Sequence, residues 1–556
     1  MISKKTIIRS IFGFIIIFII MVPNILAGNI YYIDHTNGYD QNDGLSTSTA
    51  WKTIEKANST LLPGDTVYIR AGIYYERISP ENSGSEGNYI TYRNYEEEEV
   101  IIDGLSQGIL LDNKEFIAVV GLKISNVGRF VVIQNGSKNN IIQNCNMQGS
   151  HNWSGVHIEN SSHNKILDNY IYDCHGDLVS LYPNADYNLI QGNEIDGGPT
   201  NTHSCLLIRS TNDQDYSSYN IVRNNHLHDP SDDVVNMLQK VNYNLIEDNV
   251  FYNASHGAGL KFCGGQNNII RRNIAIDCKA YSFGIYSSLY GGYQSYGINN
   301  IFYNNVAFRS DRGNDMDAGF RLLVYEGGGE IRNNIVKNNV TFENSPQQVY
   351  IDGDPGWKDY VHPNLYINNV IFDTSPDKNI VRYLGLRYTL QEIELQKPSQ
   401  FINNIDTYPD FVDANNKNFL LKSGSPCINT GDWLTVITSS GSGNHIPVED
   451  AGYFCDGFGI IDGDLIQLEG QTQTAKITNV DYDSNIITVD TPLSWYSGQG
   501  VSLPYYGYAP DIGAYEYYET STPLNASMDA SPGSGFVPLS VSFMGSATGG
   551  SEPYTY

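Results

Sequence analysis

Basic residues are scarce in this sequence. Lys and Arg together number 33 among 556 residues, against 61 Asp and Glu, and the formal net charge is −28. Such a chain repels nucleic acid and anionic lipid, so neither is an expected partner. It also repels an acidic polysaccharide unless a cation or a local group of Lys and Arg intervenes. Binding of an acidic polymer would therefore require a bound cation or a local cluster of Lys and Arg.

Cysteine and several catalytic signatures are also scarce or missing. Seven cysteines in a chain of this length do not make a disulfide scaffold, so we expect small buried side chains. The eleven histidines show no zinc-ligand spacing, and neither a phosphate-binding Gly-rich loop nor a Ser-His-Asp signature stands out. These absences argue against a nucleotide-dependent enzyme and against a serine hydrolase.

The central region lacks any long stretch with helical periodicity and instead carries a repeat. The pattern Asn-x-Ile/Val/Leu-x-x-Asn recurs with a unit of about 24 residues, lengthened in places by loops. A preceding copy has Asn140 and Cys145 in the two places. Self-similarity at a fixed period indicates a solenoid. The Asn pairs are Asn164/Asn169, Asn188/Asn193, Asn220/Asn225, Asn244/Asn249, Asn268/Asn273, Asn300/Asn305, Asn334/Asn339 and Asn364/Asn369.

The repeat unit has the pattern of short strands. In Asn244–Phe251 β-branched and aromatic residues alternate with polar ones, which favours strands over helices. A coil of about 24 residues suits three short strands and three turns. We predict an all-β fold, a single right-handed parallel β-helix of the pectin-lyase-like kind. Its asparagines should occupy equivalent turns in left-handed conformations and stack as ladders of side-chain amides.

The N-terminus has the pattern of an export signal. Lys4, Lys5 and Arg9 precede the apolar run 11–22, and Leu26-Ala27 offers a cleavage site between small residues. A retained membrane anchor is the alternative, because the run is close to the minimum length for a span. Either way, we expect the protein to be secreted or held at the cell surface.

The remaining segments suggest a division of the chain. Residues 50–61 have the pattern of an amphipathic helix that would cap the first coil. We predict the following division: 1–27 signal peptide, 28–110 N-terminal cap and first coils, 111–430 parallel β-helix, 431–518 C-terminal β insert and closing segment, and 519–556 a linker with a truncated PKD-like domain.

The run DGxxxxxAWKTIxKAN…PGDTVYIRAGIYYE at 43–76 resembles the opening of secreted right-handed parallel β-helix proteins. Many of those are polysaccharide lyases or hydrolases, and others are cell-surface proteins of unknown activity. The resemblance extends over about residues 30–430 and implies architecture more than activity. Residues 532–556 resemble the first half of an immunoglobulin-like PKD domain, which implies that the natural protein continues further.

Alignment of the coils on the first ladder Asn places His157, Leu181, Met237 and Lys261 in one outward column. Matching segment 258–261 to 283–286 and 318–321 extends the column to Tyr286 and Arg321. Successive coils would place the column members about 4.8 Å apart. Such a column suits β-elimination on a uronic acid polymer. One basic group would neutralise the uronate carboxylate, while another basic group, or Tyr286, would take the proton. Lys and Arg do these jobs in β-helix lyases that the chain resembles.

A second column holds Asp177 and Asp233, with Asp232 adjacent and Asp317 aligned to it. Two coils separate the first pair by roughly 9–10 Å, which suits the two carboxylates of an inverting glycosidase. The segment 228–233 with His256 faintly resembles polygalacturonase-type hydrolases. Alternatively, these acids could bind Ca²⁺, or they could be ordinary turn residues. Lys261 and Asp233 should share a groove yet lie roughly 13 Å apart, too far for an ion pair.

These observations favour a secreted carbohydrate-active protein. We expect catalytic roles for Lys261, Arg321, Tyr286 and Asp233. His157, Asp177, Asp232 and His256 should bind the substrate. A polysaccharide lyase acting on an acidic glycan is favoured over a glycoside hydrolase, and the alternative is a non-catalytic adhesion or surface-layer protein. Ca²⁺ is the one cofactor considered, and the protein is expected to be a monomer whose partner is an acidic glycan or another cell-surface polymer.

Overall fold

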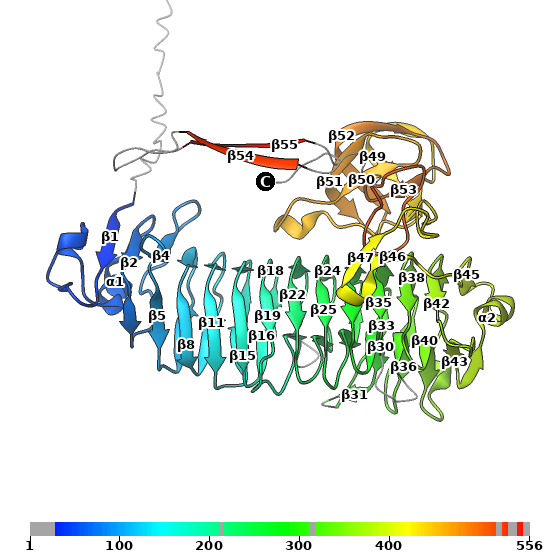
Figure 1. The fold of residues 1–556 in the computed structure, drawn as a ribbon, viewed down its shortest axis with the longest axis horizontal. Coiled ribbons are helices and arrows are strands. Elements are labelled where there is room, and N and C mark those ends of the chain that lie inside the picture. The colour runs from blue at the N-terminus through cyan, green and yellow to red at the C-terminus, as the bar shows by residue number, and fades with distance from the viewer. Residues whose placement is uncertain are drawn as a thin grey trace, which may run out of the picture.

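The fold is a long right-handed parallel β-helix with a smaller β domain attached to one side (Figure 1). The computed structural model describes residues 28–211, 215–290, 292–310 and 317–518, together with strands at 525–531 and 542–548. Each coil contributes one strand to each of three parallel sheets, here called sheets 1, 2 and 3. None of the helices in the described part of the chain combines the length and apolarity needed to cross a membrane.

Sheet 1 is the longest, and its fourteen strands follow each other along the axis of the solenoid. They are β1 (Ile30–Ile33), β2 (Thr66–Ile69), β4 (Ile90–Asn94), β7 (Ile117–Val120), β10 (Ile141–Gln143), β14 (Lys165–Leu167), β18 (Leu189–Gln191), β21 (Ile221–Arg223), β24 (Leu245–Glu247), β28 (Ile269–Arg271), β34 (Ile301–Tyr303), β38 (Ile335–Lys337), β41 (Leu365–Ile367) and β45 (Phe401–Ile402).

Sheet 2 has twelve strands, one after each sheet 1 strand along most of the solenoid. They are β3 (Gly72–Tyr74), β5 (Val100–Asp103), β8 (Lys123–Val127), β11 (Asn146–Ser150), β15 (Tyr170–Cys174), β19 (Glu194–Asp196), β22 (His226–His228), β25 (Val250–Tyr252), β29 (Ile274–Ile276), β35 (Val306–Phe308), β39 (Val340–Phe342) and β42 (Val370–Phe372).

Sheet 3 also has twelve strands; eleven complete coils before the chain returns to sheet 1, and the last, β44, forms an antiparallel hairpin with β43. They are β6 (Gln107–Asp112), β9 (Arg129–Gln134), β12 (Ser154–Ile158), β16 (Asp177–Leu181), β20 (Leu206–Arg209), β23 (Val235–Leu238), β26 (Leu260–Cys263), β30 (Tyr281–Ser287), β36 (Ala318–Val324), β40 (Gln347–Gly353), β43 (Val381–Tyr383) and β44 (Leu386–Tyr388).

Short strands close some of the turns. Two pair as β13 (Ser161–Ser162) with β17 (Ala185–Asp186), three as β27 (Gly265–Gln266), β33 (Gly297–Ile298) and β37 (Ile331–Arg332), and two as the hairpin β31 (Leu289–Tyr290) and β32 (Tyr293–Gln294). Four single-turn 3-10 helices are η1 (Thr47–Thr49), η2 (Lys358–Tyr360), η3 (Ala414–Asn416) and η4 (Gly457–Gly459).

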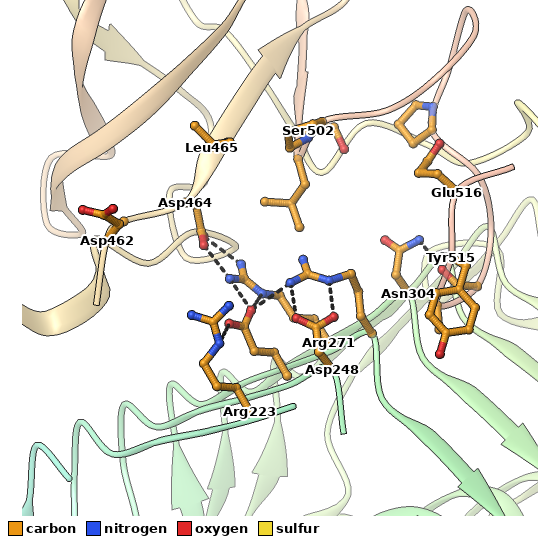
Figure 2. A pocket seen from close by; sticks show the side chains of 18 of the residues that line it. Arg223, Asp248, Arg271, Asn304, Asp462, Asp464, Leu465, Ser502, Tyr515 and Glu516 are labelled. Carbon is orange, nitrogen blue, oxygen red and sulfur yellow. Dashed lines mark hydrogen bonds and ion pairs between the residues drawn. The ribbon is translucent and has the colours of Figure 1, made fainter. Parts of the chain in front are cut away.

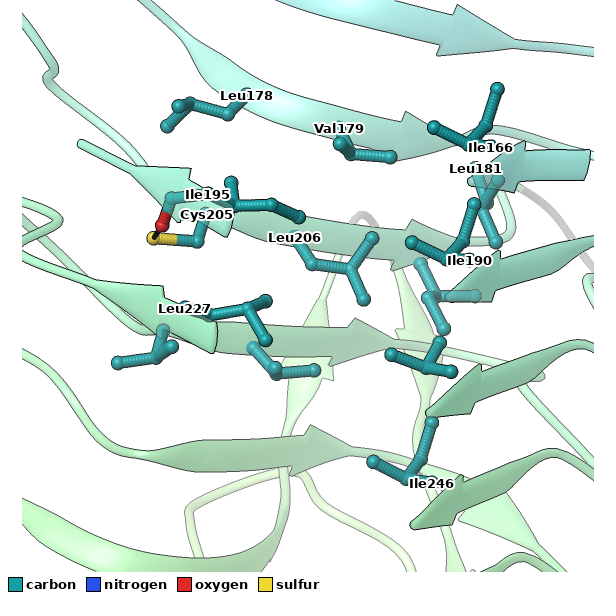
Figure 3. Packing of buried hydrophobic residues seen from close by; sticks show 14 of the residues in the cluster. Ile166, Leu178, Val179, Leu181, Ile190, Ile195, Cys205, Leu206, Leu227 and Ile246 are labelled. Atoms are coloured by element: carbon teal, nitrogen blue, oxygen red, sulfur yellow. Dashed lines mark hydrogen bonds between the residues drawn. The ribbon is translucent and has the colours of Figure 1, made fainter. Parts of the chain in front are cut away.

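The interior of the solenoid is a continuous stack of apolar side chains. Figure 3 shows part of this stack, including Leu181 and Leu206 of sheet 3. Leu181 lies opposite Ile208, which lies opposite Met237 on the next strand, and all three are fully buried. All seven cysteines are free and buried, as predicted, and Cys205 lies in the same stack. Burial of such columns along the whole axis supplies the main stabilising term, because each coil removes apolar area from water.

The Asn ladders form as predicted, and they flank sheet 1 on both sides. The amide and Nδ2 of Asn225 both donate to Asn249 Oδ1 at 3.0 Å, and Asn249 Nδ2 donates in turn to Asn273 Oδ1 at 3.0 Å. The left-handed residue is the one before the ladder position, for example Asp248 with φ of 56°. The expectation that the ladder asparagines themselves are left-handed was therefore wrong.

A helix covers each end of the solenoid. The predicted N-terminal cap is α1 (Ile54–Thr60), begun by the Thr53 side chain, which accepts a hydrogen bond from the Lys56 amide at 3.1 Å. The helix at the other end, α2 (Leu390–Gln396), was not predicted, although Thr389 and Glu392 form a capping box. Both helices bury apolar side chains in the central core, where they close the exposed ends of the stack.

The C-terminal insert is a six-stranded antiparallel domain that rests on sheet 1 (Figure 1). Its core includes the first residues of several sheet 1 strands, such as Leu245 and Ile269, so the two parts share one apolar cluster. The strands are β48 (Thr435–Val436), β49 (Gly441–Pro447), β50 (Leu465–Leu468), β51 (Thr474–Asp481), β52 (Ile486–Trp495) and β53 (Gly500–Ser502).

The segments before and after the insert cover part of sheet 2. Hairpin β46 (Phe411–Asp413) and β47 (Asn418–Leu421) packs with Ile512 onto the outer side chains of sheet 2. The predicted signal peptide and most of the PKD-like segment lie outside the described residues. Within the latter, strands β54 (Asn525–Ser531) and β55 (Ser542–Thr548) pair in antiparallel fashion. Both covering elements thus lie on sheets 1 and 2, and the predicted site residues lie toward sheet 3.

Candidate functional site on sheet 3

Lys261 and Asp233 form a buried ion pair at the centre of the candidate site. Lys261 Nζ lies 2.6 Å from Asp233 Oδ2, and the side chains are 19% and 3% exposed. The Ala258 amide donates to the other carboxylate oxygen at 2.9 Å. The predicted separation of roughly 13 Å is therefore wrong. Asp233 lies opposite Ala258, at the bend where β26 begins, and the long Lys261 side chain reaches back across three residues.

Glycine at position 257 is required by this close approach. A Cβ atom there would lie 2.5 Å from Asp233 Oδ1 and 2.6 Å from the carbonyl carbon of Asp232. Real Cβ contacts are essentially never that short, so a side chain at position 257 would push the Asp233 carboxylate out of place. His256 precedes this glycine, is exposed, and its Nδ1 lies 2.9 Å from the Ser231 carbonyl oxygen. The segment 256–257 thus shapes the turn that holds the carboxylate.

The outward column was predicted correctly for three residues and wrongly for three others. His157, Lys261 and Arg321 do share one column, in which Gly284 lies between the last two. Leu181 and Met237 instead point into the core, because the turn from Leu181 to Asn188 holds one residue more than the turn from Ile158 to Asn164. The alignment on ladder asparagines therefore shifted these strands by one residue and inverted the faces of their side chains.

Tyr286 lies on the predicted face but two residues further along its strand. It pairs with Cys263 and Leu323 rather than with Lys261 and Arg321. The Lys261 ammonium still lies 5.6 Å from the Tyr286 ring centre. Burial raises the pKa of Tyr286 well above its usual value, so the hydroxyl stays protonated and cannot serve as the base that the sequence suggested.

Arg321 is held rigidly by aromatic side chains. Its guanidinium carbon lies 4.9 Å from the Tyr281 ring centre and 5.8 Å from that of Tyr350, and Nη2 donates to the Tyr325 hydroxyl at 2.7 Å. Cation–π packing of this kind fixes the charge at an oriented position without neutralising it. Arg321 is only 7% exposed, so little of its side chain is available to a ligand.

Other basic groups lie on the same sheet and were missed by the sequence reasoning. Arg209 and Arg382 project from β20 and β43, with their guanidinium carbons 5.9 Å from the Tyr182 ring and 4.9 Å from the Tyr350 ring. Arg–Tyr stacking across neighbouring strands is the shared signal, and it could have been found only with the correct register. Sheet 3 thus concentrates part of the few basic residues of an acidic chain.

Asp177 and Asp233 lie in a single outward column, with Ser204 between them. Asp317 is displaced by one residue from this column, where Ala318 stands opposite Tyr281. Burial raises the pKa of Asp177 to about 7, and the neighbouring charges of Asp232 and Asp233 add to the increase. Burial also raises the pKa of Asp233 to about 6, although Lys261 opposes the change. The carboxyls of Asp177, Asp232 and Asp233 share this point with two cations, Lys261 and Arg209, so one negative charge is left over when all five groups are ionised.

The three carboxylates are suitable in chemistry for a hard divalent cation. Ca²⁺ prefers carboxylate and carbonyl oxygen ligands, and an excess of buried negative charge favours a bound cation. The oxygens of Asp177, Asp232 and Asp233 do not all gather within 4.8 Å of one another, so a cation here would take further ligands from water or from a glycan. The donor set fits Ca²⁺ in type but is incomplete in number.

His157 lies in the column of Lys261 and Arg321, nearer the N-terminal end of sheet 3. Its Nδ1 lies 2.9 Å from Ser180 Oγ and its Nε2 lies 3.4 Å from Glu159 Oε2. Burial, together with the charge of Arg129, lowers the pKa of His157, so the ring is neutral at pH 7. His157 lies four strands from Lys261 within sheet 3, which places it along the sheet rather than in the central cluster.

A cavity of about 830 Å³ lies elsewhere, between sheet 1 and the insert (Figure 2). Its floor carries Arg271, which bonds Asp464 Oδ2 of the insert at 2.7 Å and Glu247 Oε2 at 2.8 Å. Burial would raise the pKa of Glu247, but three guanidinium groups, those of Arg271, Arg272 and Arg223, lower it to about 2. These charges neutralise each other, so the cavity is better explained as part of the interface that holds the insert in place.

Comparison with known proteins supports the architecture. Residues 31–308, half of the chain, match the family described as "Pel9A-like, right handed beta helix region", so the chain belongs to this family. A Bacillus subtilis (strain 168) protein, YwoF, described as uncharacterized, is 27% identical over 218 residues, 36% of this chain. The chain spans 42% of the length of that curated relative.

Several solved structures are similar to the chain at low sequence identity. Pectate lyase Pel9A is 14% identical, with a TM-score of 0.46, covering 89% of this chain and 98% of its own. A structure of XylC with xylose is 12% identical, with a TM-score of 0.47, covering 85% and 99%. A PL6 family alginate lyase, AlyGC, is 18% identical with a TM-score of 0.46, covering 59% and 48%. The family match thus identifies the chain as a right-handed β-helix protein.

Proposed function

We propose that this protein is a polysaccharide lyase that cleaves a uronic acid polymer by β-elimination at Lys261. The observation that supports the proposal best is the Lys261–Asp233 pair at 2.6 Å, set on the sheet that also presents Arg321. A lysine in a partly buried site beside excess carboxylates is a candidate base, and a fixed guanidinium can neutralise a uronate. The matching family, whose description carries the name of a pectate lyase, agrees with this class of substrate.

The reaction would divide between three groups. The Lys261 amine takes the proton from C5 of the uronate, the C4–O bond breaks, and a C4=C5 double bond forms in the new sugar end. Arg321 neutralises a uronate carboxylate and thereby stabilises the negative charge that develops beside C5. The Tyr286 hydroxyl, kept protonated by burial, gives its proton to the departing oxygen. Lys261 then releases the C5 proton to solvent and Tyr286 takes a proton back from solvent, so both side chains return to their starting forms.

Lys261 must lose a proton before it can act. Burial lowers the pKa of Lys261, but the charge and the hydrogen bond of Asp233 outweigh burial and raise it above the usual value. Activity should therefore rise toward alkaline pH.

Ca²⁺ bound by Asp177, Asp232 and Asp233 would attract the uronate carboxylates to this acidic surface. Uronate polymers of this kind occur outside cells, consistent with the export that we propose from residues 1–27.

The proposal is tested by replacing the base while keeping its charge. Lys261→Arg retains a cation for Asp233 but cannot be deprotonated, and Lys261→Ala removes both functions. We expect both variants to lose formation of the unsaturated product on polygalacturonate or alginate, followed by ultraviolet absorbance. The control is Lys123→Ala on sheet 2, which removes a half-buried lysine 3.7 Å from Glu99 and should keep full activity. A fully active Lys261→Arg variant would contradict the proposed base.

A pH profile separates a catalytic role from a structural one. Asp233→Asn removes the charge that raises the Lys261 pKa, so the alkaline rise of kcat/KM should move to lower pH even if the maximum falls. A structural role for Asp233 would lower the activity at every pH without moving the profile. An unmoved profile would therefore count against Lys261 as the titrating group.

A glycoside hydrolase is the second candidate, and the acidity of Asp177 favours it. A carboxyl with a pKa of about 7 is protonated often enough near neutral pH to act as a general acid. The two reactions leave different products on the same glycan panel. New reducing ends without the unsaturated sugar would identify hydrolysis, whereas binding without either product would favour an adhesion protein.

A further inference from the structure

Four potential metal ligands face outward from two adjacent strands of sheet 2, on a face separate from the candidate lyase site. Strand β22 carries His226 and His228, and its neighbour β19 carries Glu194 and Asp196 (Figure 1). In the register of the sheet Glu194 lies opposite His226, and Asp196 lies opposite His228. Residues two apart on a strand share a face, so all four side chains project to the same side.

The hydrogen bonds of His228 determine which ring nitrogen is available. Its Nδ1 lies 2.6 Å from Asp229 Oδ2, and an ionised carboxylate can only accept a hydrogen bond, so Nδ1 carries the proton. In a neutral ring Nε2 is then left with a lone pair. That atom is buried without a hydrogen-bond partner among the described residues, on a side chain that is only 8% exposed.

Two acceptors therefore face each other without a hydrogen between them. His228 Nε2 lies 3.6 Å from Glu194 Oε1, which is too long for a hydrogen bond. Ligand atoms of His226, His228 and Glu194 all lie within 4.8 Å of one another. Two ligands bound at about 2.0–2.1 Å to a tetrahedral Zn²⁺ are separated by roughly 3.4 Å. The spacing of the pair therefore already matches the spacing of two ligands on one ion.

We propose that His226, His228 and Glu194 form a binding site for a divalent transition metal ion, with Zn²⁺ as the best match. Two imidazoles and one carboxylate are ligands that suit Zn²⁺ and related metals, whereas Ca²⁺ prefers oxygen ligands alone. Asp229 orients His228 through its Nδ1 proton, as carboxylates commonly do for metal-binding histidines. The fourth position is available to water, because Asp196 lies nearer the other ring nitrogen, with its carboxylate 3.8 Å from His228 Nδ1.

The surroundings of the site connect it to the closing segment of the chain. The Tyr252 ring stacks on His228 with centres 4.5 Å apart and planes 9° apart, which fixes the plane of the imidazole. Lys417, which directly follows η3, places its ammonium 3.2 Å from the centre of the Tyr252 ring. A metal ion here would therefore stabilise the region where hairpin β46–β47 lies against sheet 2. The site is independent of the proposed lyase reaction.

Titration of the chelator-treated full chain with ZnSO₄ by calorimetry tests the proposal. We expect one high-affinity ion per chain, and binding at least tenfold weaker in His226→Ala and in Glu194→Gln. Both replaced side chains are exposed, so the fold should survive. The matched control is His445→Ala, which removes an exposed histidine of the insert and should bind Zn²⁺ as the parent does.

Two further outcomes have definite meanings. Co²⁺ should give the visible absorption bands of a tetrahedral ion in the parent and lose them in His226→Ala, which would support the ligand set directly. The alternative is a protonated His228 held by its three neighbouring carboxylates, without any metal. Absence of saturable Zn²⁺ binding in the parent, or equal binding by His226→Ala, would overturn the proposal in favour of that protonated histidine.

Discussion

The outer faces of sheets 1 and 3 use charged side chains in opposite ways. On sheet 1, Arg271 is 2% exposed and is shared between Glu247 of the neighbouring strand and Asp464 of the insert. On sheet 3, Lys261 has one close carboxylate, that of Asp233, while Asp177 and Asp232 add further negative charge nearby. The charges around Arg271 on sheet 1 balance one another, whereas the group around Lys261 on sheet 3 keeps an excess of negative charge.

The difference is reflected in the pKa values on the two faces. Guanidinium groups lower the pKa of Glu247 to about 2, whereas burial raises that of Asp177 to about 7. A lowered carboxyl pKa contributes stability above the ordinary value near 4.5, and this stability is lost as the pH falls toward 2. A raised carboxyl pKa has the opposite effect, because stability is lost as the pH rises from the ordinary value near 3.8 through 7. Sheet 1 gains stability from ionisation, and sheet 3 loses it.

The largest predicted effect is the loss of the sheet 1 ion cluster. Arg271→Ala leaves Glu247 and Asp464 as buried charges without their main partner, which should cost roughly 3–5 kcal/mol of unfolding free energy. The insert should also become sensitive to protease, because this contact joins it to the solenoid. Denaturant unfolding and limited proteolysis measure the two effects.

The exposed pair of Arg332 and Glu330 provides the control for this prediction. Both side chains are about 40% exposed and 3.0 Å apart, and surface pairs of this kind contribute little. Arg332→Ala should therefore unfold at nearly the parent denaturant concentration. Equal destabilisation by the two substitutions would show that the comparison between buried and exposed ion pairs fails here.

A ladder substitution should destabilise the solenoid as a whole, since the ladders flank sheet 1 and join successive coils from Asn140 to Asn404. Asn249→Leu removes hydrogen bonds to Asn225, Asn273 and the Val222 carbonyl, and leaves buried backbone groups without partners. We expect a loss on the order of 1–3 kcal/mol in unfolding free energy. Asn146→Leu, at an exposed strand position, is the control. A parental melting temperature for Asn249→Leu would show that the ladder is not structural.

The fold could be predicted from the sequence because the repeat carries its own register. Asn residues five apart mark two turns of each coil from Asn164 to Asn369. Strand alternation then sets which residues between them point inward, such as Ile246, and which point outward, such as Leu245. Helix α2 was missed because seven residues outside the repeat give a weak periodic signal, although the Thr389–Glu392 capping box was present. The Asn pattern predicted the solenoid because it recurs in many coils, whereas a single capping box did not suffice to predict a helix.

The site was harder to predict because it depends on turns between the repeats. One additional residue before Asn188 inverted the expected faces of Leu181 and Tyr182, and a bend before Leu260 brought Lys261 onto Asp233. The cross-strand group formed by His226, His228 and Glu194 escaped notice because its members are close only in the register of adjacent coils. A two-residue His spacing without that register does not indicate a metal.

A substitution on sheet 3 should change the unfolding free energy by a smaller amount than Arg271→Ala, and should raise it rather than lower it. Asp177→Asn removes a buried charge but keeps a side-chain oxygen. That oxygen can still accept the hydrogen bond that the Ser204 amide donates to Asp177 Oδ1, at 3.1 Å in the parent protein. The variant should be more stable than the parent at pH 8, on the order of 1–2 kcal/mol, and no more stable at pH 4. Thermal melts at the two pH values measure the difference. A variant destabilised equally at both would show that Asp177 is held in place by its hydrogen bond alone.

The smallest predicted effect is the stabilisation of the fold by Ca²⁺, and this effect distinguishes the outer face of sheet 3 from that of sheet 1 most directly. A cation bound only by the folded chain raises its stability by about 1.4 kcal/mol when present at ten times its Kd. Excess negative charge on sheet 3 should provide such a site, whereas the neutralised cluster on sheet 1 should not. Ca²⁺ should therefore raise the melting temperature of the parent and of Arg332→Ala, but not that of Asp177→Asn, whose charge is already removed. Melting temperatures that are the same with chelator and with Ca²⁺ in every variant would leave glycan bridging, measured with substrate present, as the remaining role for the ion.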